Sequence, residues 1–259
     1  CGPTVHEDPH IGSYRRFVVS DLLRRYLAFK GYPVRLVTNI IDLADRSIRG
    51  AERADMDLAT YTERYVSAFL AGIEKLNILR DESYPRASEN VDAMLSTVEK
   101  LVQKGYAYEK LRSVYFDISK LEEYGRLSNI DLKQMGRGKI VEVDDYAKDS
   151  PVDFTLLKRS TLSELKRGVY FKTRWGNVRP SWHLECAAIA LGYLGEQFDI
   201  HLSGADIIFP HCENVLAIGK AATGKRIANY WMNAELVMVG AKKMSRSLNN
   251  AVTLADLEE

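Results

Sequence analysis

Apolar residues recur every three to four positions along much of the chain, which is the spacing of helices that bury one face. The clearest case follows a turn at residues 9–12 and continues to Phe29, where Lys30 and Gly31 form a typical helix ending. The same spacing predicts further helices over residues 58–76, 90–104, 182–194 and 212–222.

Shorter apolar runs between these helices predict strands. They lie at residues 32–39, 198–202 and 230–239, and a hairpin over 106–117 turns at Leu111 and Arg112. Residues 118–176, by contrast, are irregular and polar. Helices that alternate with strands are typical of an α/β fold, and a glycine turn at the start of the first helix is typical of a nucleotide-binding half.

We therefore predict a Rossmann-like nucleotide-binding fold with a parallel sheet, interrupted by a connective insertion. The first half of this catalytic domain spans residues 1–79, the insertion 80–175 and the second half 176–242, and residues 243–259 form a loop and the start of a following helical region. The chain begins at Cys1 rather than at Met, so we expect the strand that leads into the glycine turn to lie upstream of Cys1.

Composition narrows the class of protein without identifying a partner. The 259 residues are 46% hydrophobic, and 36 Lys and Arg balance 35 Asp and Glu, so the net charge gives no sign of nucleic-acid binding. The sequence has neither a run of roughly 20 apolar residues nor a signal peptide, and we expect a cytoplasmic location without membrane contact. Three cysteines are too few for a disulfide framework and favour a metal or catalytic role. The oligomeric state stays open.

Two short motifs near the ends of the chain have the residue types that bind ATP. His10 and Gly12 lie at a helix N-terminus, where an imidazole N–H can donate to phosphate and glycine lets the nucleotide approach the backbone. Lys243 and Ser245 lie in a loop after a predicted strand, where they could hold the β- and γ-phosphates as the α-phosphorus is attacked. Taken alone, the motif at His10 could be an ordinary turn histidine, and the motif at Lys243 could be a solvated basic loop. Together, in this order and context, they favour ATP binding.

The cysteines lie at or beside positions that could hold zinc. Cys1, Cys186 and His211 are far apart in the sequence and would meet only in a folded site at the ends of parallel strands. Structural zinc sites usually use closely spaced pairs of ligands, so this dispersal favours a catalytic or substrate-binding zinc. Cys186 could instead be a small buried residue and His211 a helix cap.

Five motifs resemble, in order, those of the cysteinyl-tRNA synthetases, a family of class I aminoacyl-tRNA synthetases. They are Cys-Gly-Pro-Thr-Val, His-Ile-Gly, Arg-Pro-Ser-Trp-His-Leu-Glu-Cys, Gly-Ala-Asp-Ile-Ile-Phe-Pro-His and Lys-Met-Ser-Arg-Ser-Leu-Asn-Asn. The resemblance runs from one end of the chain to the other. It implies ATP-dependent activation of cysteine to cysteinyl-adenylate and transfer to tRNA(Cys), by an enzyme that uses Mg²⁺ with ATP and binds one Zn²⁺ per chain.

In that family two Cys, a His and a Glu hold the zinc, which takes the sulfur of the substrate cysteine as a thiolate. The matching positions are Cys1, Cys186, His211 and Val215, so the carboxylate ligand is absent here. Water or the neighbouring Cys212 could fill the fourth position. We expect water, because consecutive helical residues point about 100° apart. Zinc–sulfur bonding also explains how serine is rejected without proofreading.

The resemblance further implies a catalytic role for His10, Lys243 and Ser245, and an amino-acid pocket at Trp182 and Ile41. Ile41 stands where the family has a Thr. Contacts to ATP or the adenylate are implied for His10, Gly12, Ser13, Gly204, Asp206, Lys243 and Met244.

Two of these side chains also have plainer interpretations. Trp182 could be a core residue, and Asp206 could cap the following helix. Ser13 takes the place of an Asn or His in the family. We interpret His183 and His201 as structural.

Two alternatives to the tRNA ligase remain open. A paralogue with the same chemistry would join cysteine or another amino acid to a small amine, as the family's mycothiol-pathway ligase does. The substitutions at Ile41 and Val215 favour it, as does the end of the chain at Glu259, before any tRNA-binding extension. A non-catalytic zinc- or nucleotide-binding remnant is the other alternative, and the two ATP motifs argue against it.

Overall fold

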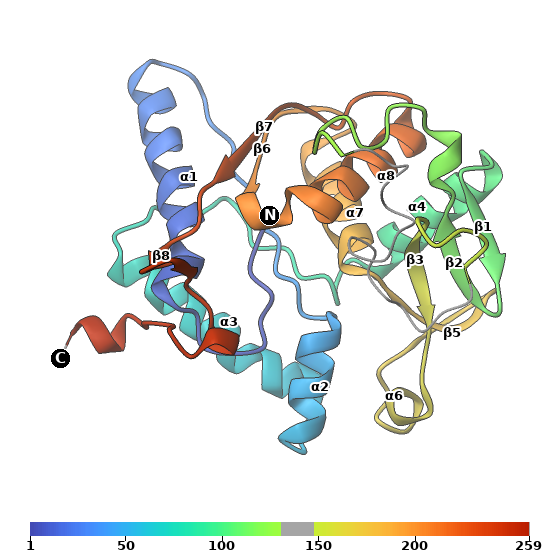
Figure 1. Cartoon of the computed structure of the whole chain (residues 1–259), viewed down its shortest axis with the longest axis horizontal. Helices are drawn as coiled ribbons and strands as arrows, with labels where there is room; N and C mark the ends of the chain where they lie inside the picture. The colour runs from blue at the N-terminus through green and yellow to red at the C-terminus, as the bar shows by residue number, and fades with distance from the viewer. Residues whose placement is uncertain (131–147, 259) are drawn as a thin grey trace. The chain divides into compact units, whose positions relative to one another are not determined.

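The computed structural model describes residues 1–130 and 148–258, which fold into two compact units (Figure 1). The first unit comprises Cys1–Ala87, Asp199–Ile207 and Tyr230–Glu259, and the second comprises Ser88–Phe198 and Ile208–Asn229. The division of the sequence at residues 79, 175 and 242 stays a prediction, and parts of its insertion (131–147) and of its last segment (259) lie outside the described residues.

The first unit holds three long or medium helices and several short elements near the C-terminus. The strands β6 and β7 belong to it except for their first residues, which fall in the second unit. Its helices and strands are α1 Ile11–Phe29, α2 Asp45–Arg53, α3 Leu58–Lys75, β6 Phe198–Gly204, η2 Ala205–Ile207, β7 Ala228–Ala234, β8 Met238–Val239, β9 Lys242–Lys243, η4 Arg246–Leu248 and η5 Ala255–Leu257.

Short parallel pairings form the frame of the first unit. Thr4 pairs with Ile41, and Ile40 in turn pairs with Arg86, both in parallel. The backbone nitrogen of Cys1 donates to the carbonyl of Leu202 on β6 at 2.7 Å, and β6 pairs with β7. The chain therefore sets β7, β6, the N-terminal segment and the segments around residues 40 and 86 side by side, as expected for a nucleotide-binding α/β unit.

Helices α1 and α3 pack over this frame through aromatic rings. Phe69 of α3 lies edge-on to Phe17 of α1, with ring centroids 4.8 Å apart, and is stacked on Tyr14 at 6.1 Å. Val5 and Ile40 of the paired segments complete the same buried cluster. Burying these rings fixes the N-terminal end of α1, where the glycine turn lies.

The second unit is built on a five-stranded antiparallel sheet with strand order β1-β2-β3-β5-β4. Fully buried apolar side chains of its three longer helices, among them Met94, Leu184 and Ile218, form the core of this unit. Its helices and strands are α4 Val91–Gln103, β1 Ala107–Lys110, β2 Ser113–Phe116, η1 Ile118–Lys120, β3 Phe154–Arg159, α6 Leu162–Lys166, β4 Phe171–Thr173, β5 Gly176–Pro180, α7 Trp182–Leu194, η3 Ile208–Cys212 and α8 Glu213–Thr223.

The predicted long helices and the hairpin are confirmed. The hairpin turns at Leu111 and Arg112, which both have left-handed backbone angles, with φ of 50° and 65°. The turn therefore has the geometry that a two-residue hairpin loop requires.

Two other expectations about the elements are wrong. Residues 32–39 form no regular strand, because only their last part pairs, through Val37 and Ser83. Residues 118–176 are not irregular throughout, since β3, α6 and β4 lie there. The strand expected upstream of Cys1 stays a prediction, and Thr4 pairs in parallel with Ile41.

None of the helices in the described part of the chain is both long enough and apolar enough to cross a membrane.

Candidate functional site

His10 caps the N-terminus of α1 in the first unit. Its backbone is extended, and its Nδ1 accepts a hydrogen bond from the backbone N–H of Ser13 at 3.2 Å. A ring nitrogen that accepts cannot carry the proton, so the neutral imidazole carries its hydrogen on Nε2. The turn thus fixes one N–H donor of His10 at a helix N-terminus, which is where an anion binds.

Partial burial lowers the pKa of His10 below its usual value of 6.5, and this is the largest of the influences on it. The carboxylate of Glu7 acts against this shift, whereas the guanidinium groups of Arg246 and Arg16 reinforce it. At neutral pH the ring is therefore neutral, which preserves the hydrogen bond from Ser13.

We expect His10 to titrate below pH 6.5 in the folded protein. Because its folded-state pKa is depressed, its contribution to stability is present above pH 6.5 and is lost as the pH falls through the folded pKa, where Nδ1 can no longer accept from Ser13. An NMR titration of the His10 ring, assigned with the His10→Gln variant, measures this pKa. A value of 6.5 or higher would contradict the expectation.

Gly12 lies at a position that has no room for a side chain. A Cβ on this residue would lie 2.9 Å from Nδ1 of His10 and 3.5 Å from Cβ of Met244. The first distance is shorter than real Cβ contacts allow, so a side chain here would push the His10 ring aside. The second distance places the motif at Lys243–Ser245 next to the turn.

The side chain of Asn250 forms two hydrogen bonds within the loop that follows Lys243. The Asn250 side chain accepts from the backbone N–H of Ser245 at 2.8 Å and donates to the carbonyl of Lys243 at 3.0 Å. Ser245 also shares a hydrogen bond with Ser247 at 2.8 Å. The side chain of Lys243 is exposed while Met244 is buried, so the loop presents its lysine to solvent on a fixed backbone.

Backbone contacts attach the end of this loop to the His10 turn. The N–H of Ile11 donates to the carbonyl of Val252 at 2.8 Å, and His10 pairs antiparallel with Thr253. Together with the approach of Met244 to Gly12, these contacts bring the two ATP motifs into one site, although they are more than 230 residues apart.

The residues expected at the C-terminal end of β6 lie in the same unit. Oδ1 of Asp206 would be 2.7 Å from a Cβ on Gly204, so the carboxylate folds back over a bare backbone position. Ser203 donates to the side chain of Asn233 on β7 at 2.6 Å. Ile41 is almost fully buried and lies on the parallel pairing with Thr4. The ends of parallel strands are where nucleotide-binding folds place their ligands.

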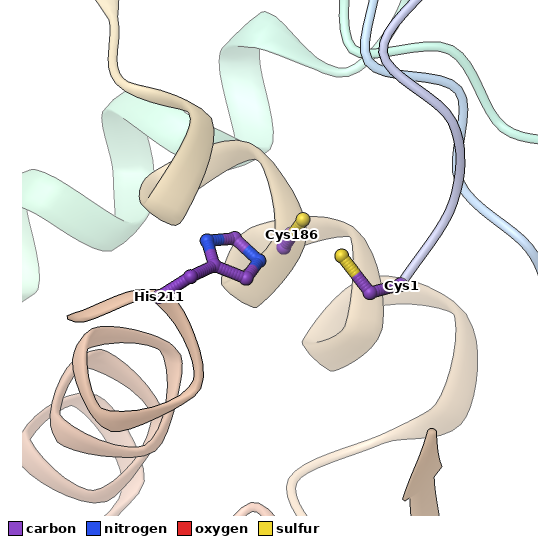
Figure 2. Close-up of side chains that lie close together, drawn as sticks. All are labelled: Cys1, Cys186 and His211. Atoms are coloured by element: carbon purple, nitrogen blue, oxygen red, sulfur yellow. The ribbon is translucent and has the colours of Figure 1, made fainter. Parts of the chain in front are cut away.

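Figure 2 shows the three side chains that can ligate a metal: Cys1, Cys186 and His211. Cys186 on α7 and His211 just before α8 both belong to the second unit, and the sulfur of the one lies within 4.8 Å of a ring nitrogen of the other. Two ligands of a tetrahedral zinc are roughly 3.5 Å apart, given bonds of about 2.0 to 2.3 Å. Thiolate and imidazole are the donor types that zinc prefers, so this pair fits zinc.

His211 is held by two neighbours on α7. Its Nδ1 lies 2.9 Å from Nδ1 of His183, and its ring stacks on Trp182 with centroids 3.9 Å apart. One ring nitrogen of His211 is thus engaged by a neighbouring side chain, as is usual for ligating histidines. His183 therefore orients a candidate ligand, a role that goes beyond the structural one expected from the sequence.

We expect His183→Phe to weaken zinc binding by about 10- to 100-fold, because Phe keeps the ring volume and removes the hydrogen bond to His211. Competition with a chromogenic zinc chelator measures the affinity. His201→Phe is the matched control, since His201 is also a buried histidine but belongs to the first unit, where its ring lies tilted against that of Trp231. Equal affinities for wild type and His183→Phe would show that the contact does not orient the ligand.

Cys212 and Val215 are both fully buried. Cys212 is the N-cap residue of α8, so His211 is not the helix cap that one interpretation allowed. Among the described residues, Cys212 is not one of the group of close metal-ligand atoms. The aliphatic side chain of Val215 has no atom that can coordinate.

Comparison with known proteins assigns the family. The family model described as the catalytic domain of class I (C) tRNA synthetases matches residues 1–259. The chain belongs to this family. The cysteine–tRNA ligases of Methanosarcina acetivorans and Methanosarcina mazei are 46% and 45% identical to this synthetase domain over 259 residues, which is 100% of the chain and 55% of each relative. That of Pyrococcus horikoshii is 41% identical over 257 residues, or 99% of the chain and 53% of the relative.

The synthetase domain thus spans about half the length of these curated relatives. Among solved structures, a Mycobacterium tuberculosis methionyl-tRNA synthetase in complex with methionyl-adenylate matches with a TM-score of 0.74 at 16% identity. The match covers 99% of this chain and 60% of that one. A putative arginyl-tRNA synthetase from Campylobacter jejuni matches with a TM-score of 0.60 at 12% identity, over 99% of this chain and 58% of that one. These likenesses confirm the Rossmann-like α/β fold.

Sequence reasoning missed three residues of the synthetase domain that organise the site: His183, Arg246 and Asn250. The signal for His183 was its place between Trp182 and Cys186 on one helix. Asn250 and Arg246 lie in the last matched motif, but their partners could be found only from the folded loop.

Proposed function

We propose that the chain is the catalytic domain of a cysteine–tRNA ligase, which activates cysteine with ATP and transfers it to tRNA(Cys). The observation that carries this proposal is the meeting of the two ATP motifs at Gly12 and Met244. Membership of the family and the names of its relatives support the choice of amino acid.

In the first step a carboxylate oxygen of cysteine attacks the α-phosphorus of ATP. The bond from that phosphorus to the bridging oxygen breaks, and pyrophosphate leaves with the developing negative charge. The Nε2–H of His10 and the ammonium of Lys243 stabilise that charge, and Ser245 orients the loop that carries the lysine. Mg²⁺ bound to ATP would supply further positive charge at the phosphates. No side chain needs to act as a nucleophile.

The adenylate is then held at the strand ends. Gly204 leaves room for the Asp206 carboxylate beside the backbone, and that carboxylate can accept hydrogen bonds from the ribose or the amino group. Ser13 fixes the ring of His10, and Met244 packs beside Gly12.

The resemblance to the family implies that Cys1, Cys186 and His211 would hold one zinc ion. Zinc would bind the sulfur of the substrate cysteine, which serine cannot match. Trp182 stacks on His211 and would line the pocket for the amino acid. With Val215 in place of a carboxylate, we propose water rather than Cys212 at the remaining position.

A second candidate is a ligase that joins an amino acid to a small amine. Two buried aliphatic side chains favour it, because Ile41 and Val215 stand where the family has a hydroxyl and a carboxylate. Both substitutions alter the amino-acid and zinc side of the site and leave the ATP motifs intact.

Pyrophosphate exchange with each of the 20 amino acids in turn tests these proposals. We expect exchange that depends on cysteine. Dependence on a different amino acid would favour the second candidate, and no exchange with any would point to a non-catalytic remnant. With cysteine confirmed, charging of tRNA(Cys) separates the tRNA ligase from the amine ligase.

A further inference from the structure

The turns at residues 121–130 are joined to the first turn of α8 by hydrogen bonds between buried groups. The backbone N–H and the hydroxyl of Ser128 both donate to Oε2 of Glu213, at 2.9 Å and 2.8 Å. The hydroxyl of Tyr124 donates to Oδ1 of Asn214. Glu213, Asn214 and Tyr124 are 0%, 1% and 4% exposed. All four residues belong to the second unit, as does His211, which lies two residues before Glu213.

The carboxylate of Glu213 depends on Ser128. Its other oxygen, Oε1, is buried and has no hydrogen-bond partner among the described residues. A buried carboxylate that loses a hydrogen bond is strongly disfavoured, because it has also lost its contacts with water. Ser128 therefore holds the first residue of α8 in one place.

Tyr124 reaches the surroundings of His211 by a second route, through aromatic rings. Its ring is stacked on that of Phe154 on β3 with centroids 6.3 Å apart, and Phe154 lies edge-on to His183 at 5.9 Å. His183 is the residue whose Nδ1 lies 2.9 Å from Nδ1 of His211. Tyr124 thus acts both on the helix that follows His211 and on the packing of the ring that contacts it.

A third contact joins the same segment to the opposite end of α8. Glu123 forms an ion pair with Lys220, which lies about two turns along the helix from Glu213. This pair is partly exposed, and such pairs contribute little to stability. The segment therefore holds the first turn of α8 with buried hydrogen bonds and the last turn with a weak ion pair.

We propose that Ser128 and Tyr124 are positioning residues for His211: by holding Glu213 and Asn214 they fix where α8 begins, and with it the orientation of the imidazole. The consequence for zinc rests on the proposed function, whereas the contacts themselves need no ligand. A metal ligand that is already oriented loses less conformational freedom when the ion binds, so the affinity is higher.

Amide hydrogen exchange over residues 213–218 of the metal-free protein tests whether the segment holds the helix. We expect about three- to tenfold faster exchange in Ser128→Ala and in Tyr124→Phe, because each loses one hydrogen bond to a buried group. Ser128→Thr keeps both donors and should exchange like wild type. Glu123→Gln is the matched control, since it weakens the contact of the same segment with Lys220 at the far end of α8. Unchanged exchange in both Ser128→Ala and Tyr124→Phe would overturn the proposal.

Zinc titration of the metal-free protein shows whether the effect reaches His211. We expect Ser128→Ala and Tyr124→Phe to bind zinc about three- to tenfold more weakly, and Ser128→Thr and Glu123→Gln to bind it as tightly as wild type. The visible spectrum of the cobalt-substituted protein reports ligand geometry and should shift only in the two weakened variants. Faster exchange with unchanged zinc affinity and an unchanged spectrum would make these residues stabilisers of α8 alone, and would overturn the proposal.

The NMR signals of the His211 ring in the metal-free protein provide a readout that does not depend on zinc. They should move in Ser128→Ala and in Tyr124→Phe, and stay in place in Glu123→Gln. If wild type binds no zinc, the zinc site of the proposed function fails, and these signals still decide whether Ser128 and Tyr124 position His211. Signals that stay in place in all three variants would show that they do not.

Discussion

Replacing Lys243 by alanine should lower the rate of amino-acid activation by roughly 100-fold or more and change ATP affinity less. The ammonium group faces solvent from β9, in a loop whose backbone is fixed by Asn250. A cation on the transferring phosphates stabilises charge that grows as pyrophosphate departs, so it contributes more to the transition state than to bound ATP. Single-turnover formation of the adenylate, measured over a range of ATP concentrations, separates the two effects.

Lys242 offers a matched control for this experiment. Lys242 and Lys243 are adjacent on β9 and pair with Val239 and Met238 of β8. Successive side chains of a strand point to opposite faces, so Lys242→Ala removes the same charge from the other face of the hairpin. We expect it to stay within about twofold of wild type, as surface substitutions usually do. Equal losses in rate and in ATP affinity for Lys243→Ala would make Lys243 a ground-state anchor.

The long helices could be predicted because local signals agree with the fold. In α3 the Asp57 side chain caps the first turn at Thr60, and the apolar face with Phe69 is buried. The nine-residue α2 was missed because it is highly charged and buries mainly small residues. One of these, Gly50, lies so close to the ring of Tyr61 that a Cβ would come within 2.3 Å of its hydroxyl. Such packing depends on a partner that the local pattern does not reveal.

The strands β3 and β5 of the second unit were missed for a similar reason. On β3, four successive residues from Phe154 are all buried, so the alternation that marks a half-exposed strand is absent. On β5, the buried Arg179 forms an ion pair with Glu164, in which Nη2 lies 2.8 Å from Oε1. A charge inside a strand lowers its apparent hydrophobicity, and its partner becomes known only when the chain is folded.

In the candidate site, too, local patterns could be predicted from the sequence and tertiary partners could not. His10 and Lys243 were found because each lies in a short motif with a recognisable residue pattern. The groups that position them were not found: the hydrogen bond from Arg246 to Asp8 joins residues 238 positions apart. Residue type therefore indicated which groups carry the chemistry, and only tertiary structure indicates what holds them.

Removing the thiol of Cys186 should abolish stoichiometric zinc binding. We expect one zinc per chain in wild type, purified without chelator, and a loss of affinity of more than about 100-fold in Cys186→Ala. A residue that merely orients a ligand contributes 10- to 100-fold, and a direct ligand contributes more. Metal analysis by mass spectrometry and zinc titration of the metal-free protein measure both quantities.

The variant Cys212→Ala tests whether Cys212, which lies next to His211, is itself a zinc ligand. Cys212 is as buried as Cys186 and adjoins His211, but it is not in the group of close ligand atoms among the described residues. Cys212→Ala should therefore keep its zinc, with water at the position that the family fills with a carboxylate and that Val215 cannot fill. Loss of zinc from Cys212→Ala would instead make Cys212 the fourth ligand. The site would then be closed by four protein ligands, with no open position for the sulfur of the substrate, and cysteine would be a poor candidate for the amino acid. Metal-free wild type with full activity would remove zinc from the mechanism altogether.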